Sequence, residues 1–138
     1  MKLTENFTLD EMTASVTAAC LGIDNTPRTE EIERLRELCV KILQPLRDRL
    51  GSPLRVTSGY RCVTLNRAVG GVKNSQHING EAADLVCHDN RKLWELIREM
   101  KKAEEIKPGQ VINENNLSWI HISLPRKSSE GKKITSRV

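Results

Sequence analysis

Two histidines and one aspartate are spaced in a way that could hold a metal ion. His77 and Asp84 lie seven residues apart, with Gly80 and two alanines between them, and His121 follows Asp84 by 37 residues. Neutral imidazole and ionised carboxylate are both good zinc ligands, and three protein ligands with an open fourth position are typical of a catalytic zinc site. If the three side chains converge, they could form such a site, in which a zinc ion can activate a bound water molecule.

The surrounding residues predict two strands that would bring these ligands together. Residues 82–87 and 118–124 both alternate as strands. Alternation places Asp84 on one face with Ala82 and Val86, and His121 on one face with Trp119 and Ser123. If the strands are neighbours, the three ligands converge. A lone histidine is more often a hydrogen-bonded structural residue, so the spacing alone leaves both interpretations open.

Helix signals fill the first third of the chain. Thr8 with Glu11 forms a capping-box pattern, which predicts a short helix from Leu9, and a further helical stretch ends at Gly22. Thr26 followed by proline predicts the start of a long amphipathic helix that ends at Gly51.

The remaining elements alternate between strand and helix. Pro45 should kink or loosen the last turns of the long helix. A strand is expected over 54–58, a short helix within 61–71, and a helix over 91–103 that Asp89 or Asn90 can cap. Residues 110–124 predict a strand, a turn and a strand.

Composition and charge restrict the class of protein. The 138 residues suit one domain, the hydrophobic content of 38% is that of a soluble protein, and no apolar run reaches membrane-spanning length. The first residues lack the apolar region of a secretory signal, so we expect synthesis in the cytoplasm. The net charge of +4 resides in residues 126–138, so it gives no support to nucleic-acid binding by the body of the chain.

The motif set resembles the zinc D-Ala-D-Ala carboxypeptidase-like family of murein peptidases, in its phage-associated and bacterial types. The resemblance covers residues up to about 125, and its fold is shared with the signalling domain of hedgehog proteins. It rests on Ser75-x-His77-x-x-Gly80-x-Ala82-x-Asp84, on Trp119-Ile120-His121-Ile122-Ser123, on Ser58-Gly59-Tyr60-Arg61 with Leu65-Asn66, and on the N-terminal blocks at 7–12 and 21–27.

The resemblance implies an α+β fold in one domain, with a small antiparallel sheet that carries the zinc site and helices packed on one face. The domain would span 1–125, with N-terminal helices over 8–50 and the zinc-site sheet over 54–124, followed by a basic polar tail over 126–138. His77, Asp84 and His121 would bind Zn²⁺.

The implied function is hydrolysis of peptidoglycan stem peptides by a monomeric zinc metallopeptidase, either as a D-Ala-D-Ala carboxypeptidase or as a murein endopeptidase. Phage lysis or a phage particle would bring the protein to the bacterial cell wall. The alternative is a peptidoglycan-binding module of the same fold that does not turn over substrate.

Four further residues are candidates for work at this site. The planar guanidinium of Arg61 suits a carboxylate or carbonyl oxygen of the substrate. Ser75 and Trp119 are candidate substrate-binding residues. Glu114 is the candidate general base, since it matches the glutamate that ends a similar block in relatives, although Ser118 and Gly109 stand where some relatives have acidic residues.

Overall fold

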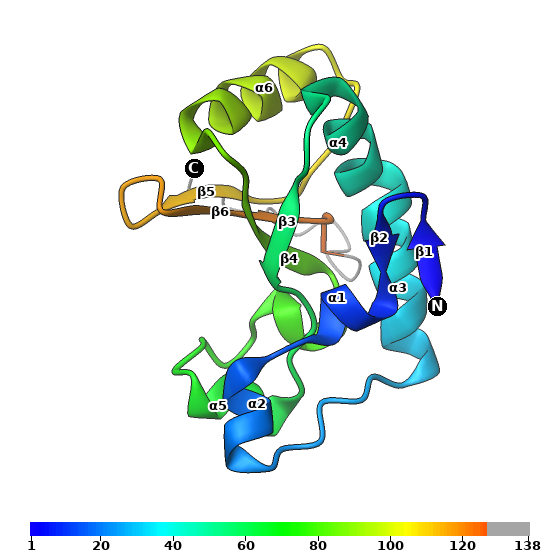
Figure 1. Ribbon diagram of the computed structural model, residues 1–138, viewed down its shortest axis with the longest axis vertical. Coiled ribbons are helices and arrows are strands. Elements are labelled where there is room, and N and C mark those ends of the chain that lie inside the picture. The colour runs from blue at the N-terminus through cyan, green and yellow to red at the C-terminus, as the bar shows by residue number, and fades with distance from the viewer. Residues whose placement is uncertain (127–138) are drawn as a thin grey trace.

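A four-stranded antiparallel sheet forms the centre of the molecule, as the computed structural model of residues 1–126 shows (Figure 1). Its strands lie in the order β3 (Arg55–Ser58), β4 (Ala82–Val86), β6 (Trp119–Ser123) and β5 (Val111–Glu114). The predicted α+β class and the small antiparallel sheet are therefore confirmed. No strand end lies more than one residue inside its predicted range.

One face of this sheet belongs to the hydrophobic core. Strand alternation directs Ala83 and Leu85 of β4, together with Ile120 and Ile122 of β6, into a cluster that is fully shielded from solvent. Helical leucines and isoleucines complete the cluster. They come from α3 (Thr29–Leu38), the π-helical turn η1 (Cys39–Leu43), α4 (Gln44–Leu50) and α6 (Asn90–Lys102). The opposite parity of the same strands leaves Asp84 and His121 on the other face.

The N-terminal hairpin and the first helix pack beside the long helix (Figure 1). Thr8 caps α1 (Leu9–Thr13) as predicted, since its hydroxyl accepts the backbone N–H of Glu11, and α2 (Val16–Leu21) ends at Gly22 in the left-handed conformation. The Glu11 carboxylate, however, accepts the N–H of Val56 and so ties α1 to the sheet. A small hairpin of β1 (Lys2–Thr4) and β2 (Phe7–Thr8) was not predicted, because strands this short carry too little alternation.

The long helix begins two residues later than predicted, at Thr29 instead of Pro27. Thr26 does not cap it, because both its N–H and its hydroxyl are engaged by the Asp24 carboxylate in a local turn. Instead, the side chain of Glu31 accepts the N–H of Arg28 at the true helix start. Pro45 lies in the first turn of α4, directly after the π-helical turn. Proline has no backbone N–H to donate, and the wider π-helical turn accommodates this missing hydrogen bond.

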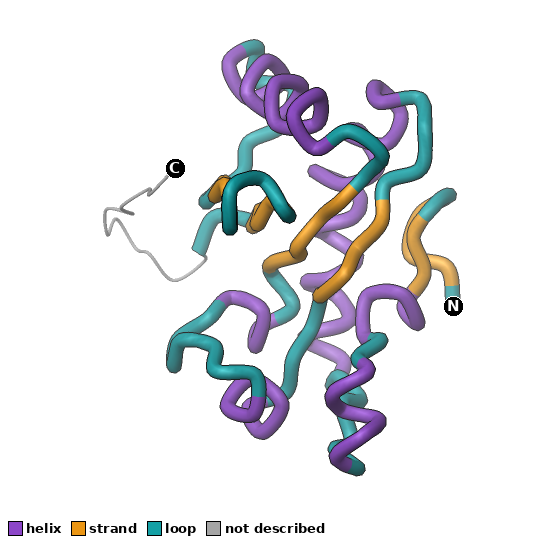
Figure 2. Tube along the Cα trace, turned by 60° about the vertical axis from the view of Figure 1, so that its left-hand side comes forward, coloured by secondary structure: helices purple, strands orange, loops and turns teal. Residues whose placement is uncertain are grey.

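The second half of the chain brings two short helices to the site. These are α5 (Val63–Ala68), which lies within the predicted range, and the 3₁₀ turn η2 (Gln76–Asn79), which was expected to be a loop. Figure 2 shows this part of the chain beside one end of the sheet. The carboxylate of Asp89 caps α6, in agreement with the sequence.

None of the helices within residues 1–126 combines the length and apolar character needed to cross a membrane. The predicted basic tail, residues 126–138, lies outside the described residues except for Arg126, whose guanidinium donates to the backbone oxygen of Asn74.

Candidate metal centre

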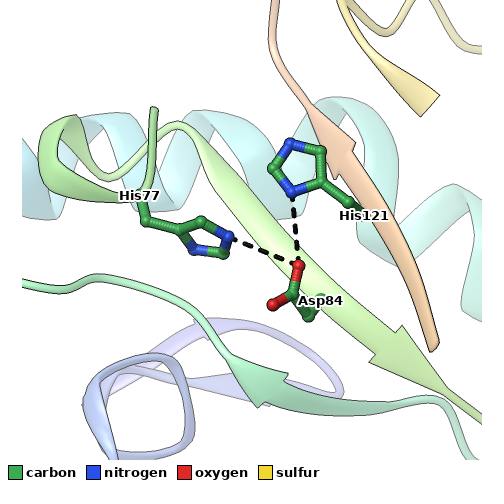
Figure 3. A group of neighbouring side chains, drawn as sticks. All are labelled: His77, Asp84 and His121. Atoms are coloured by element: carbon green, nitrogen blue, oxygen red, sulfur yellow. Dashed lines mark hydrogen bonds and ion pairs between the residues drawn. The ribbon is translucent and has the colours of Figure 1, made fainter. Parts of the chain in front are cut away.

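The three predicted ligands meet on the open face of the sheet (Figure 3). Asp84 of β4 and His121 of β6 are paired directly across the two strands, and His77 approaches from η2. One carboxylate oxygen of Asp84 lies 3.3 Å from His77 Nε2 and 3.2 Å from His121 Nδ1. The expectation that the two strands are neighbours is therefore confirmed.

The loop around His77 fixes both the position and the tautomer of its ring. Ser75 caps the 3₁₀ turn by accepting the N–H of His77, and Gly80 ends the turn in the left-handed conformation that glycine adopts most easily. The ring nitrogen Nδ1 lies 2.7 Å from the carbonyl oxygen of Gly59. Because a carbonyl can only accept, Nδ1 carries the proton and Nε2 has its lone pair free toward Asp84.

The charge state of Asp84 suits a ligand. Burial alone would raise the pKa of this carboxyl group, but the adjacent imidazoles of His121 and His77 outweigh burial and hold the pKa well below its ordinary value. Asp84 is therefore ionised across the physiological range.

The donor set fits Zn²⁺. Two imidazole nitrogens and one carboxylate oxygen lie within 4.8 Å of one another. The two histidine–aspartate distances are close to the roughly 3.4 Å that separates two ligands bound tetrahedrally at about 2.1 Å. His77 also has the outer hydrogen bond, to Gly59, that zinc-bound histidines normally make. Among the described residues, His121 Nε2 is buried without a hydrogen-bond partner, so the pair of histidines is not a closed structural network.

A cleft of about 630 Å³ opens over these three side chains. One wall is the segment that joins α5 to η2, and the other consists of β5 and β6. The cleft is lined by all seven residues that the sequence singled out: Arg61, Ser75, His77, Asp84, Glu114, Trp119 and His121. Ser75 is buried, and its hydroxyl already serves as the cap of η2.

The register of the β5–β6 hairpin decides which way Glu114 points. The sequence allowed two registers, one with Asn113 opposite Trp119 and one shifted by a residue. The structure has Glu114 opposite Trp119 and Ile112 opposite His121. Since alternate residues share a face, Glu114 lies on the same face as His121 and lines the cleft. His88, in contrast, is exposed at the end of β4.

Arg61 approaches the site from the segment after β3. Its backbone N–H donates to the carbonyl oxygen of His77 at 3.1 Å, which fixes the arginine next to the first ligand. The side chain is half-buried, and its Nε has no hydrogen-bond partner among the described residues. Burial lowers the pKa of the guanidinium, and the negative charge of Asp84 partly offsets that effect. Arg61 therefore brings a positive charge and free donors to the cleft.

A buried polar network supports the loop that carries His77, and the sequence alone assigned no role to the residues of this network. Glu81 is almost fully buried, where it pairs with Arg34 of α3 and accepts a hydrogen bond from Gln76. Gln76 also donates to the carbonyl oxygen of Leu124, just after β6. The network thus joins the loop that carries His77 to both α3 and β6. The sequence signal was a charged residue between Gly80 and Ala82, at a position flanked by small residues.

The packing around Gly59 gives a testable prediction for the loop. A Cβ atom at Gly59 would overlap the carbonyl oxygen of Met12, and this backbone atom cannot move aside as a flexible side chain could. Gly59→Ala should therefore lower the free energy of unfolding by about 2–3 kcal/mol, as overpacking does. The matched control is Gly22→Ala, where a Cβ meets nothing within 4 Å and only the left-handed backbone costs energy, about 1 kcal/mol. Equal losses in chemical denaturation would contradict the prediction.

Comparison with known proteins gives two matches. Residues 5–123 match the family model described as Peptidase M15. A segment of 44 residues is 50% identical to a zinc D-Ala-D-Ala carboxypeptidase from Streptomyces albus G. That segment is 31% of this chain and 17% of the relative, so the likeness to the Streptomyces protein is local.

Proposed function

This chain belongs to the peptidase M15 family and is a zinc peptidase, and we propose that it hydrolyses peptide bonds in the stem peptides of peptidoglycan. The observation that carries the proposal is the convergence of His77, Asp84 and His121 at the floor of a cleft, in a chain that matches the family over residues 5–123. The likeness to a zinc D-Ala-D-Ala carboxypeptidase supports a substrate that contains D-Ala-D-Ala.

We assign zinc binding to His77 through Nε2, His121 through Nδ1 and the carboxylate of Asp84, because these atoms face one another. A bound zinc ion would supply a Lewis acid for the scissile carbonyl and a lowered pKa for water. The protein prepares these ligands in advance. Gly59 holds the tautomer of His77, and the direct strand pair holds Asp84 against His121.

The proposed task of Arg61 is to orient the substrate. Its donors lie beside the ligand loop and are not used by other described side chains, so they are available to a carboxylate or carbonyl oxygen. Trp119 lines the same cleft from β6 and offers an apolar wall. The Ser75 hydroxyl accepts the backbone N–H of His77. We propose that Ser75 affects substrate binding indirectly, by holding His77 in position.

Glu114 is the proposed general base. Its carboxylate oxygen would take a proton from the attacking water and deliver it to the nitrogen of the leaving amine. The support for this role is that Glu114 shares the face of His121 and lines the cleft. Gly109, which stands where relatives often have an aspartate, has a structural role, because a side chain there would overlap the backbone of Leu124 and Pro125.

Incubation of zinc-loaded protein with purified sacculi tests the proposed function. Mass spectrometry of the muropeptides should show new products, and their masses distinguish loss of a terminal D-Ala from cleavage inside the stem peptide. Binding to sacculi without new products would favour the binding module of the same fold. Delivery to the wall by phage lysis or in a phage particle stays an expectation, as does a monomeric state, although one chain supplies all three proposed ligands.

Replacing Arg61 with lysine tests its role in orientation. The variant keeps a positive charge and loses the planar two-pronged donor group, so it should retain zinc while kcat/KM falls roughly tenfold or more. Arg67→Lys, on the exposed side of α5, is the matched control and should leave kcat/KM unchanged. Wild-type kinetics in Arg61→Lys would mean that the arginine only supports the fold.

A further inference from the structure

The cleft contains a second guanidinium group, that of Arg126, which the proposed function does not use. We infer that Arg126 forms a second carboxylate-binding subsite, which recognises the free internal carboxylate of an acidic stem peptide and selects it over the amidated form. This inference rests on the proposed function and adds a specificity that the metal centre and Arg61 do not provide.

Arg126 lies at one end of the cleft. It follows β6, five residues beyond His121, and its Nη2 donates to the carbonyl oxygen of Asn74 at 3.0 Å. Asn74 belongs to the segment between α5 and η2, so this hydrogen bond connects the two walls of the cleft. Trp119 lies two residues before His121 on the same strand. His121 therefore lies between Trp119 and Arg126 along this stretch of the chain.

The charge of Arg126 is not compensated by the residues that the structure describes. Its one hydrogen-bond partner is a neutral carbonyl, which leaves most of the five guanidinium donors free. Three arginines of the described chain are paired with carboxylates, Arg28 with Glu31, Arg34 with Glu81 and Arg49 with Glu105, and Arg126 is not among them. An arginine without such a partner, half-buried in a cleft, provides charge-assisted hydrogen bonds for an incoming carboxylate.

A second cavity, of about 530 Å³, also borders Arg126 and contains acidic side chains. Two of these carboxylates are already committed. Glu105 pairs with Arg49, and Glu37 pairs with Lys41 at 2.9 Å. The described ion pairs do not join either of them to Arg126. The guanidinium instead reaches Asn74, which lines the cleft of the metal centre and not this second cavity.

The chemistry of the substrate matches two arginines. A γ-linked glutamate leaves its α-carboxylate free inside a stem peptide, and the peptide also ends in a carboxylate. A lysine-containing stem peptide therefore has two carboxylates at separate positions. Arg61 and Arg126 come from different segments of the cleft, and each can bind one carboxylate in a two-pronged geometry.

The test uses two synthetic peptides, L-Ala-γ-D-Glu-L-Lys-D-Ala-D-Ala and the same peptide with the glutamate α-carboxylate converted to a primary amide. The wild-type protein should prefer the acidic peptide by about tenfold or more in kcat/KM. Arg126→Gln should lower kcat/KM for the acidic peptide by that factor and leave the amide peptide almost unchanged, so that the preference disappears. Lys73→Gln removes an exposed positive charge from the same segment without touching the cleft, and should keep the preference.

Two outcomes would overturn the inference. An equal loss of kcat/KM on both peptides in Arg126→Gln would show that the arginine only holds the Asn74 segment in place. Equal kcat/KM values for both peptides in the wild type would show that no subsite recognises the α-carboxylate of the glutamate. Cleavage of either peptide tests the proposed function separately. Where neither peptide is cleaved, the ratio of Kd values from calorimetry decides the role of Arg126 by the same criterion.

Discussion

His121→Ala is expected to weaken zinc binding by roughly a hundredfold or more and to remove peptidase activity with it. The expectation follows from the geometry, because His121 Nδ1 and His77 Nε2 face the same oxygen of Asp84. Removing one imidazole leaves two ligands, and two ligands do not define a tetrahedral site. Metal analysis of the purified variant after dialysis measures the loss directly.

The control for this substitution is His88→Ala. His88 is the remaining histidine of the chain and is exposed at the end of β4, so its removal should leave both zinc content and activity unchanged. Chelation gives a second measurement. A ligand that binds only the folded state raises Tm, so EDTA should lower the Tm of the wild type and have little effect on His121→Ala. Full zinc occupancy in His121→Ala would refute the assignment of the three ligands.

The convergence of these ligands could be predicted from the sequence because it depends on short-range rules. Alternation fixes the face of Asp84 on one strand and of His121 on the other, and the small Ala82, on the same face as Asp84, leaves room beside it. Helix caps are local in the same way, and Thr8, Gly22 and Asp89 all act where the sequence places them.

The parts that could not be predicted depend on contacts between distant segments. Thr26 has the sequence of a helix cap, but a neighbouring carboxylate captures its hydroxyl. The tautomer of His77 depends on a carbonyl 18 residues earlier, and Glu81 is buried because Arg34 reaches it across 47 residues. Arg126 was assigned to a basic tail on composition alone, although its side chain contacts Asn74 and lines the cleft. Local sequence patterns do not encode these pairings.

Glu114 lies between these two cases. The sequence identified it as the acidic residue that precedes His121 in the last hairpin, but the direction of its side chain depended on strand register. A shift of one residue in the register moves the side chain to the opposite face of the sheet. The observed pairing, Glu114 with Trp119 and Ile112 with His121, puts the carboxylate on the face of the metal centre. The geometry therefore permits the role of general base and makes its removal informative.

Glu114→Gln should lower kcat by roughly a hundredfold or more, while zinc content and Tm stay close to those of the wild type. Glutamine keeps the shape of the side chain and removes the basic oxygen, so water loses its proton acceptor and the leaving amine loses its proton donor. The matched control is Glu95→Gln, which removes one exposed carboxylate from α6 and should leave kcat unchanged. Near-normal kcat in zinc-loaded Glu114→Gln would exclude Glu114 as the base. Because Asp84 is committed to the histidines, proton transfer would then have to come from a group outside the seven residues singled out in the cleft.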